Sequence, residues 1–174
     1  MPLVISDSST LIHLAAIGRL GLLKEFYGKI TIPAAVWREV VEEGKGRAGA
    51  VEVEEARQAG WIEVVSCEDE PLLRLLKRDL DEGEAEVIAL AIGQRASLVL
   101  LDETEARSIA ELYGLRKTGV IGVLMRAKRD GKVQSLRAEL DKLRYQAGFW
   151  IDEGLYRQAL RAVGEERGAG EQGS

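Results

Sequence analysis

Four acidic residues stand where apolar runs end or helical patterns begin: Asp7, Glu39, Glu84 and Asp102. Asp7 closely follows the apolar run at residues 3–5, and Asp102 follows the run at residues 98–101. A carboxylate at the end of a buried parallel strand is costly unless a cation compensates its charge. In open α/β sheets this edge is also where ligands bind. Carboxylates that converge there would form a site for a hard divalent cation.

Each of the two strand-end acids also has an alternative structural role. Asp7 could cap the helix that follows it, although Ser8 or Ser9 could cap that helix instead and leave the carboxylate free. Thr104 is in the same way an alternative cap beside Asp102. From the residues alone, capping and metal binding therefore stay open for both acids.

The two glutamates carry weaker signals. Glu39 is flanked by apolar residues in the pattern at residues 36–41, but a single Glu in a helix is most often on the surface. Glu84 is one of four acids around Gly83. Acids in a first helical turn interact favourably with the helix dipole, which explains part of this cluster without any function.

Short apolar runs predict buried strands at residues 3–6, 29–32, 62–65 and 97–101, with a shorter one at 115–118. Helical patterns lie between and after them, at residues 8–15, 20–26, 33–43, 48–58, 71–78, 83–94, 104–113, 119–129, 135–145 and 152–163. Strands alternating with helices predict an α/β fold, with a central parallel sheet of four to five strands flanked by helices on both faces. We expect one domain over residues 1–163 and a disordered Gly-rich tail over residues 164–174.

The composition excludes several chemistries. The 174 residues include one cysteine, Cys67, and one histidine, His13. An intrachain disulfide, a Cys-rich zinc site and a His-rich metal site are therefore excluded. Ser-His-Asp catalysis is disfavoured, because packing or capping on a helix explains His13. Any catalysis must rest on carboxylates, hydroxyls and cations.

The apolar pattern also bears on location. No apolar stretch approaches the ~18 residues that span a bilayer. No basic segment precedes the N-terminal apolar run, so that run does not have the pattern of a signal peptide. Together with the single cysteine, this predicts a cytoplasmic protein that is not associated with a membrane.

The charge is unevenly distributed. The net charge of −5 argues weakly against general nucleic-acid binding, since neutralising phosphates needs Lys and Arg. Residues 126–144, however, carry +4, and the rest of the chain carries −9. Such a stretch is either a solvated helix surface with its own ion pairs or a surface that binds nucleic-acid backbone. The candidates for backbone binding are Arg126, Lys128, Arg129 and Lys132.

Several segments are distinctive in their order along the chain: residues 4–12 (VISDSSTLI), 32–40 (IPAAVWREV), 81–91 (DEGEAEVIALA), 100–103 (LLDE), 118–124 (TGVIGVL) and 127–131 (AKRDG). Together they resemble the PIN-domain superfamily, over roughly residues 3 to 132. The Gly-Glu-Ala-Glu element resembles a prokaryotic subgroup related to VapC-type toxins. The resemblance implies a parallel sheet ringed by helices, and an acidic pocket that binds Mg²⁺ or Mn²⁺ and cleaves single-stranded RNA.

The resemblance also implies roles for individual residues. The four family acids, which are both metal ligands and catalytic residues, fall on Asp7, Glu39, Glu84 and Asp102. The third acid is commonly Asp in the toxin branch, so Glu84 is a departure and Glu86 competes for its place. The family hydroxyl beside the first acid falls on Ser8. Further groups implied around the pocket are Glu86, Glu103, Glu105 and Thr118.

These implications predict a metal-dependent endoribonuclease in which one or two ions activate water for in-line attack on a phosphodiester. VapC-like toxins pair with a small antitoxin protein and often form homodimers, so the resemblance implies both partners here. Trp37, Trp61 and Trp150 are candidate interface anchors, although large aromatic side chains are more often in the core.

Two other classes of function compete with this prediction. A PIN-like fold with an unused acidic pocket would be a non-catalytic nucleic-acid or protein binding module, although the presence of all four acids argues against it. Asp102 could instead be a receiver-type phosphoacceptor, but that fold needs an acidic pair after the first strand, where serines flank Asp7. A haloacid-dehalogenase-like phosphatase needs Asp two positions after Asp7, and Ser9 stands there.

Overall fold

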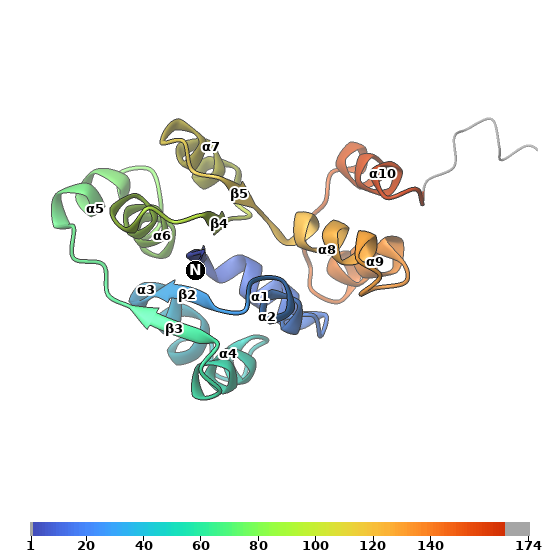
Figure 1. Ribbon diagram of the computed structural model, residues 1–174, viewed down its shortest axis with the longest axis horizontal. Coiled ribbons are helices and arrows are strands. Elements are labelled where there is room, and N and C mark those ends of the chain that lie inside the picture. Colours follow the sequence, from blue (N-terminus) through green and yellow to red (C-terminus); the bar gives the residue numbers. More distant parts are fainter. Residues whose placement is uncertain (1, 166–174) are drawn as a thin grey trace, which may run out of the picture. The chain divides into compact units, whose positions relative to one another are not determined.

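The computed structural model describes residues 2–165, and the chain divides between Val120 and Ile121 into two compact units. The first unit contains the β-sheet and the four acids, and the second is helical (Figure 1). Whether residues 1–163 act as the one domain predicted from the sequence stays a prediction. Within residues 2–165, no helix is long and apolar enough to cross a membrane.

The described part of the first unit is built on a sheet of five strands that all run parallel: β1 (Val4–Ser6), β2 (Ile30–Pro33), β3 (Ile62–Val65), β4 (Leu98–Leu100) and β5 (Lys117–Thr118). Their order is β3-β2-β1-β4-β5, which confirms the predicted α/β class. The central strands are covered on both faces, and Ile5, Ile32 and Val99 are inaccessible to solvent. Because of this double cover, these strands have no alternation of buried and exposed residues, and even the polar Thr31 of β2 and Ser6 of β1 are buried.

Helices connect these strands: α1 (Ser8–Ala16), α2 (Gly21–Tyr27), α3 (Ala34–Trp37), η1 (Arg38–Glu42), α4 (Ala50–Gln58), α5 (Glu70–Leu76), α6 (Glu82–Gln94) and α7 (Thr104–Leu112). One of these helices differs from the sequence prediction. The helix expected at residues 33–43 is α-helical only in α3, and it continues as a π-helical turn, η1. Gly44 follows this wide turn, and a Cβ there would collide with the Val40 carbonyl oxygen. Periodicity alone does not distinguish such a turn from an α-helix.

The strand order distributes the helices over two faces. From β1 the chain proceeds to β2 and β3 on one side, and it then crosses back to β4 and β5 on the other. Right-handed crossovers therefore put α1, α2 and α4 on one face and α6 and α7 on the opposite one. Figure 1 shows α1 and α2 across the sheet from α5 and α6. The winding direction reverses between β1 and β4, which is where open α/β sheets bind ligands.

The second unit consists, over its described residues, of α8 (Val120–Arg129, which begins at the unit boundary), α9 (Leu136–Tyr145) and α10 (Glu153–Ala162). Tyr156 of α10 joins the last two helices. Its hydroxyl donates to Asp141 Oδ1 at 2.8 Å, and its ring centroid lies 4.1 Å from the Arg144 guanidinium carbon. A buried polar and cation–π contact of this kind aligns α9 with α10.

The predicted tail over residues 164–174 is described only at Gly164 and Glu165. There the chain is held against the start of α9, because the Glu165 carboxylate accepts hydrogen bonds from the N–H groups of Leu136 and Arg137. Residues 166–174 lie outside the described residues, so the disorder expected for them stays a prediction.

Candidate functional site

Asp7 and Asp102 lie side by side at the switch point of the sheet. Asp7 directly follows β1, and Asp102 comes two residues after β4; in these neighbouring strands Ser6 pairs with Leu100. The Asp7 N–H donates to Leu100 O at 3.0 Å, and the Asp102 N–H donates to Asp7 Oδ2 at 3.1 Å. The parallel pairing therefore brings two carboxylates 95 residues apart in sequence to one edge.

Asp7 is the N-cap of α1. Its Oδ1 accepts a hydrogen bond from the Thr10 N–H at 2.8 Å, while its Oδ2 accepts from Asp102. Only 2% of the residue is exposed. The alternative in which Ser8 or Ser9 caps this helix and frees Asp7 is wrong, because both serines lie inside the first turn.

Asp102 is held by donors from two segments of the chain. Its Oδ1 accepts from the Val120 N–H at 2.8 Å, and its Oδ2 accepts from the hydroxyls of Ser9 at 3.3 Å and Thr10 at 3.1 Å. None of these bonds belongs to α7, whose N-cap is Glu103 with no side-chain cap bond. Capping of α7 therefore does not explain Asp102, and the bond from Val120 satisfies the first N–H of α8 instead.

The charge on Asp7 is strongly disfavoured in this environment. Burial, followed by the negative charge of Asp102, raises the pKa of Asp7 from 3.8 to about 8. The hydrogen bonds from Thr10 and Asp102 lower this pKa and only partly offset the increase. Two carboxylates held this close would be relieved by a bound cation.

The raised pKa predicts that the metal-free protein loses stability as the pH rises. Folded Asp7 binds its proton more tightly than unfolded Asp7, so its stabilising effect is complete below pH 3.8 and is lost through about pH 8. Across this window we expect ionisation of Asp7 to lower the unfolding free energy progressively as the pH rises. The Asp7→Asn variant should lack this contribution. Urea unfolding in a chelator at pH 5.5, 7 and 8.5 measures the difference.

Asp69→Asn is the matched control for this comparison, since Asp69 caps α5 through Leu72 N–H but is solvent-exposed. The deciding quantity is the unfolding free energy of Asp7→Asn minus that of the parent. This difference should increase between pH 5.5 and 8.5, and a difference that does not increase refutes the raised pKa of Asp7.

Glu39 is carried by η1 and points toward α1. The Ser8 hydroxyl donates to Glu39 Oε2 at 2.7 Å, so the hydroxyl next to the first acid binds the second acid. A Cβ built on Gly83 would lie 3.4 Å from the same oxygen, which places the Glu39 carboxylate against the first turn of α6.

Glu84 forms a capping box at the start of α6. Its N–H donates to Asp81 Oδ1 at 2.8 Å, and its own carboxylate accepts from the Asp81 N–H at 3.3 Å. Burial raises the pKa of Glu84, and the charges of Asp81, Glu103 and Glu39 raise it further. Glu84 therefore lies within electrostatic reach of the second acid.

Glu86, the rival of Glu84, serves a different element. It is 7% exposed, and its Oε1 accepts from the Ala35 N–H at 3.3 Å, at the start of α3. Burial raises the pKa of Glu86, whereas the Ala35 hydrogen bond lowers it. This contact explains the buried acid as a cap for a neighbouring helix.

The other predicted residues divide into two groups. Glu103 is close enough to raise the pKa of Glu84, so it borders the acids. Glu105 is exposed in the first turn of α7, and Thr118 acts through its backbone, whose carbonyl accepts from the Leu101 N–H at 2.9 Å. Site roles for Glu105 and Thr118 stay predictions.

The donor set fits a hard divalent cation in its chemistry, because it consists of carboxylates and hydroxyls. Among residues 2–165, however, no three Asp, Glu, His or Cys side chains are grouped so that they could hold a metal ion. Asp7 and Asp102 are joined by a hydrogen bond, Glu39 is bound to Ser8 of α1, and the charge of Glu39 reaches Glu84. Direct ligation by a third acid would require a glutamate side chain to turn away from its present donor.

The sequence does not single out four further residues of the site: Ser9, Thr10, Arg107 and Gly119. The two hydroxyls orient Asp102, and Arg107 Nη1 donates to Leu101 O at 3.0 Å. A Cβ on Gly119 would lie 2.5 Å from Asp102 Oδ1 and 3.1 Å from Arg107 Nη1, so all three groups share one small space. The hydroxyl run after Asp7 and the glycine before α8 were the available signals.

The predicted backbone-binding cations belong to the second unit. Arg126, Arg129 and Lys132 are exposed, and Arg126 Nε lies 3.5 Å from Asp130 Oδ2. Lys128 Nζ donates to Gln134 O and lies 3.8 Å from Glu165 Oε2. The intrahelical pair matches the solvated-surface interpretation for Arg126, and nucleic-acid binding by the four residues stays a prediction.

Comparison with known proteins gives a match that spans nearly all of the described chain. A protein-family model described as a PIN domain matches residues 3–165, a range that includes all four acids and extends over most of both units. A search of curated proteins finds no match. The family match confirms the resemblance to the PIN-domain superfamily inferred from the sequence.

Proposed function

The chain belongs to the PIN-domain family, and we propose that it is a metal-dependent endoribonuclease that hydrolyses phosphodiester bonds in single-stranded RNA. PIN domains are generally nucleases, and they typically use divalent metal ions. The observation that supports this most strongly is the Asp7–Asp102 pair, in which the buried carboxylate of Asp7 is held beside the carboxylate of Asp102 at the switch point. Such an arrangement is unfavourable in a purely structural role.

We assign the first contact with Mg²⁺ or Mn²⁺ to Asp7 and Asp102. Glu39 and Glu84 would act through water or after rotation of their side chains, because carboxylates can ligate directly or through solvent. When bound, the ion lowers the pKa of a water and stabilises charge that develops on the phosphate.

The chain's own groups would orient the reacting partners. Hydroxyls and N–H groups hold both aspartates in fixed directions, so the pair does not need to reorganise during the reaction. Arg107 already donates to Leu101 O beside Asp102, and it retains further N–H groups. We assign it to a non-bridging oxygen of the scissile phosphate, since guanidinium groups bind phosphate with strong, charge-assisted hydrogen bonds.

Glu84→Gln is expected to lower Mn²⁺-dependent cleavage of single-stranded RNA by about tenfold or more, while Glu86→Gln leaves it unchanged. Both substitutions remove one negative charge and keep an oxygen that accepts the existing backbone hydrogen bond. They differ in location, since only Glu84 lies within reach of Glu39. Initial cleavage rates with a labelled RNA, with and without EDTA, measure the effect.

The opposite ranking of the two variants would assign the third acid to Glu86. A pure preparation that cuts no RNA or DNA of any tested sequence at saturating Mn²⁺ would refute the enzyme proposal. In that case the alternative, a non-catalytic binding module, would account for glutamates that bind the chain's own donors.

The VapC resemblance also bears on the partners of the chain and on its location in the cell. We propose a cytoplasmic toxin that is paired with a small antitoxin protein and forms a homodimer, as the VapC resemblance implies. Co-purification of the chain with a protein encoded next to it, and the mass of the purified species, test these two partners directly.

A further inference from the structure

The connection between α9 and α10 presents two large aromatic side chains to solvent. Tyr145 is 81% exposed and Trp150 is 80% exposed. Both line the same hollow of about 400 Å³, together with Arg144, Gly148 and Phe149. Large rings are normally buried in a folded chain, so two exposed rings around one concavity require an explanation.

The two exposed rings lie on a segment whose backbone is fixed by hydrogen bonds. Arg144 Nη2 donates to Ile151 O and to Glu153 Oε2, both at 3.1 Å, and the Phe149 N–H donates to Leu143 O at 2.8 Å. Ile151, the residue after Trp150, is only 5% exposed. The backbone on both sides of the rings is therefore fixed, and the rings are presented outward by the fold.

Among the described residues, the one charged residue that lines the hollow is Arg144, and the net charge of the unit that carries it indicates which kind of ligand is complementary. Residues 121–165 contain nine Lys and Arg and six Asp and Glu, a net +3, whereas residues 1–120 contain fourteen and twenty-one, a net −7. A positive unit with exposed rings is complementary to a polyanion that has flat apolar faces, which describes single-stranded nucleic acid. A second copy of this unit carries the same net positive charge, so it is less complementary to the hollow than a polyanion is.

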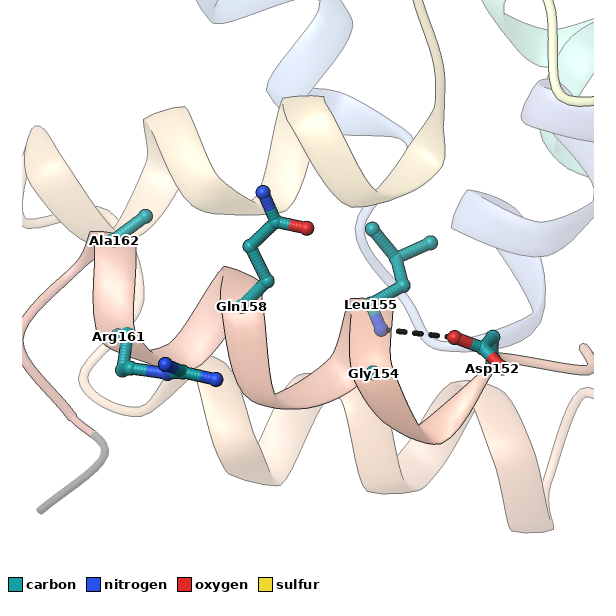
Figure 2. Close-up of a pocket in the computed structure, with 6 residues that line it drawn as sticks. All are labelled: Asp152, Gly154, Leu155, Gln158, Arg161 and Ala162. Atoms are coloured by element: carbon teal, nitrogen blue, oxygen red, sulfur yellow. Dashed lines mark hydrogen bonds between the residues drawn. The ribbon is translucent and has the colours of Figure 1, made fainter. Parts of the chain in front are cut away.

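A second hollow in the same unit lacks these features. It has a volume of about 750 Å³ and is lined by α10 residues without an aromatic ring among them (Figure 2). Figure 2 shows that its acid, Asp152, faces back to its own helix, where it accepts from the Leu155 N–H at 3.2 Å. This hollow offers no stacking surface.

We infer that the hollow at Tyr145 and Trp150 binds the bases of single-stranded RNA by stacking. The inference rests on the proposed function for the choice of RNA, and it adds a base-binding site in the second unit. Stacking on an aromatic ring tolerates any base, because every base has a π-face, so this site would supply affinity rather than sequence preference.

The test measures binding apart from cleavage. Full-length protein carrying Asp102→Asn, in EDTA, is titrated into a fluorescently labelled 12-nucleotide oligouridine, and its Kd is read from anisotropy. Trp150→Ala and Tyr145→Ala should each weaken binding about 5- to 150-fold, whereas Trp150→Phe keeps most of it. Leu112→Ala, which removes an exposed apolar side chain from the first unit, should leave the Kd unchanged. A duplex of the same length should bind more weakly, since its bases are paired.

Unchanged oligouridine binding in both alanine variants overturns the inference, and so does a parent protein that does not bind the oligomer. If the alanine variants instead change the molar mass by light scattering while their Kd values equal the parent's, the hollow is a protein interface. Failure of the proposed function would appear separately, as absent cleavage by wild-type protein in Mn²⁺ with ring-dependent binding retained.

Discussion

Asp102→Asn is expected to reduce metal-dependent RNA cleavage by at least about 100-fold and to leave the fold intact. Asn preserves each existing contact, because its carbonyl oxygen can accept from the Val120 N–H and its amide can donate to the Ser9 and Thr10 hydroxyls. Only the charge is lost. Losing a ligand charge should exceed the ~10–100-fold effect typical of losing a partner of a ligand.

Two measurements make this result specific. Urea unfolding should show nearly unchanged stability, and the pKa of Asp7 should fall, since the Asp102 charge contributes to raising it. Asp79→Asn removes an exposed carboxylate from the same unit and serves as the control for net charge. Cleavage by Asp102→Asn within a few-fold of wild type would exclude Asp102 as a catalytic residue.

Gly119→Ala is the second substitution with a large expected effect. The new methyl carbon would lie 2.5 Å from Asp102 Oδ1, closer than carbon and oxygen can approach, and 3.0 Å from Leu101 O, which is a tight contact. Asp102 would have to move away from the Val120 N–H, which leaves that donor unsatisfied. We expect a loss of about 1–3 kcal/mol in unfolding free energy and a ~10–100-fold loss in cleavage.

Gly93→Ala provides the matched control, because no heavy atom lies within 4 Å of a Cβ built there. Gly93 is inside α6, where Ala should stabilise the helix by up to about 1 kcal/mol. Unfolding curves and cleavage rates for the two variants are compared under the same conditions. Wild-type behaviour of Gly119→Ala in both assays would show that Asp102 is not confined as described.

Most of the fold follows from patterns that are local in the sequence. The run at residues 62–65 becomes β3 with the predicted bounds, and the pattern at 83–94 becomes α6 after a shift of one residue at its start. These elements are predictable because burial on both faces and helical periodicity leave direct traces in residue type. The π-helical turn η1 leaves no such trace, since α and π turns present similar apolar faces over five residues.

The candidate site is less completely determined by local pattern. Asp7 and Asp102 are recognisable as strand-end acids, but whether a side chain caps its own helix or faces a distant strand depends on the final packing. Asp7 does both, since one oxygen caps α1 and the other accepts from Asp102. The pairing of Glu39 with Ser8 and the role of Glu86 at α3 likewise join residues 31 and 51 positions apart.

The sequence by itself therefore determined the fold class, the family resemblance and the identity of the two strand-end aspartates. Only the tertiary structure decided which acids share a space, which ones cap helices, and that Gly119 and Arg107 border Asp102. The physical reason is the range of the interactions involved. Periodicity and capping act within a few residues of chain, whereas charge repulsion and close approach act through space and depend on the strand order β3-β2-β1-β4-β5.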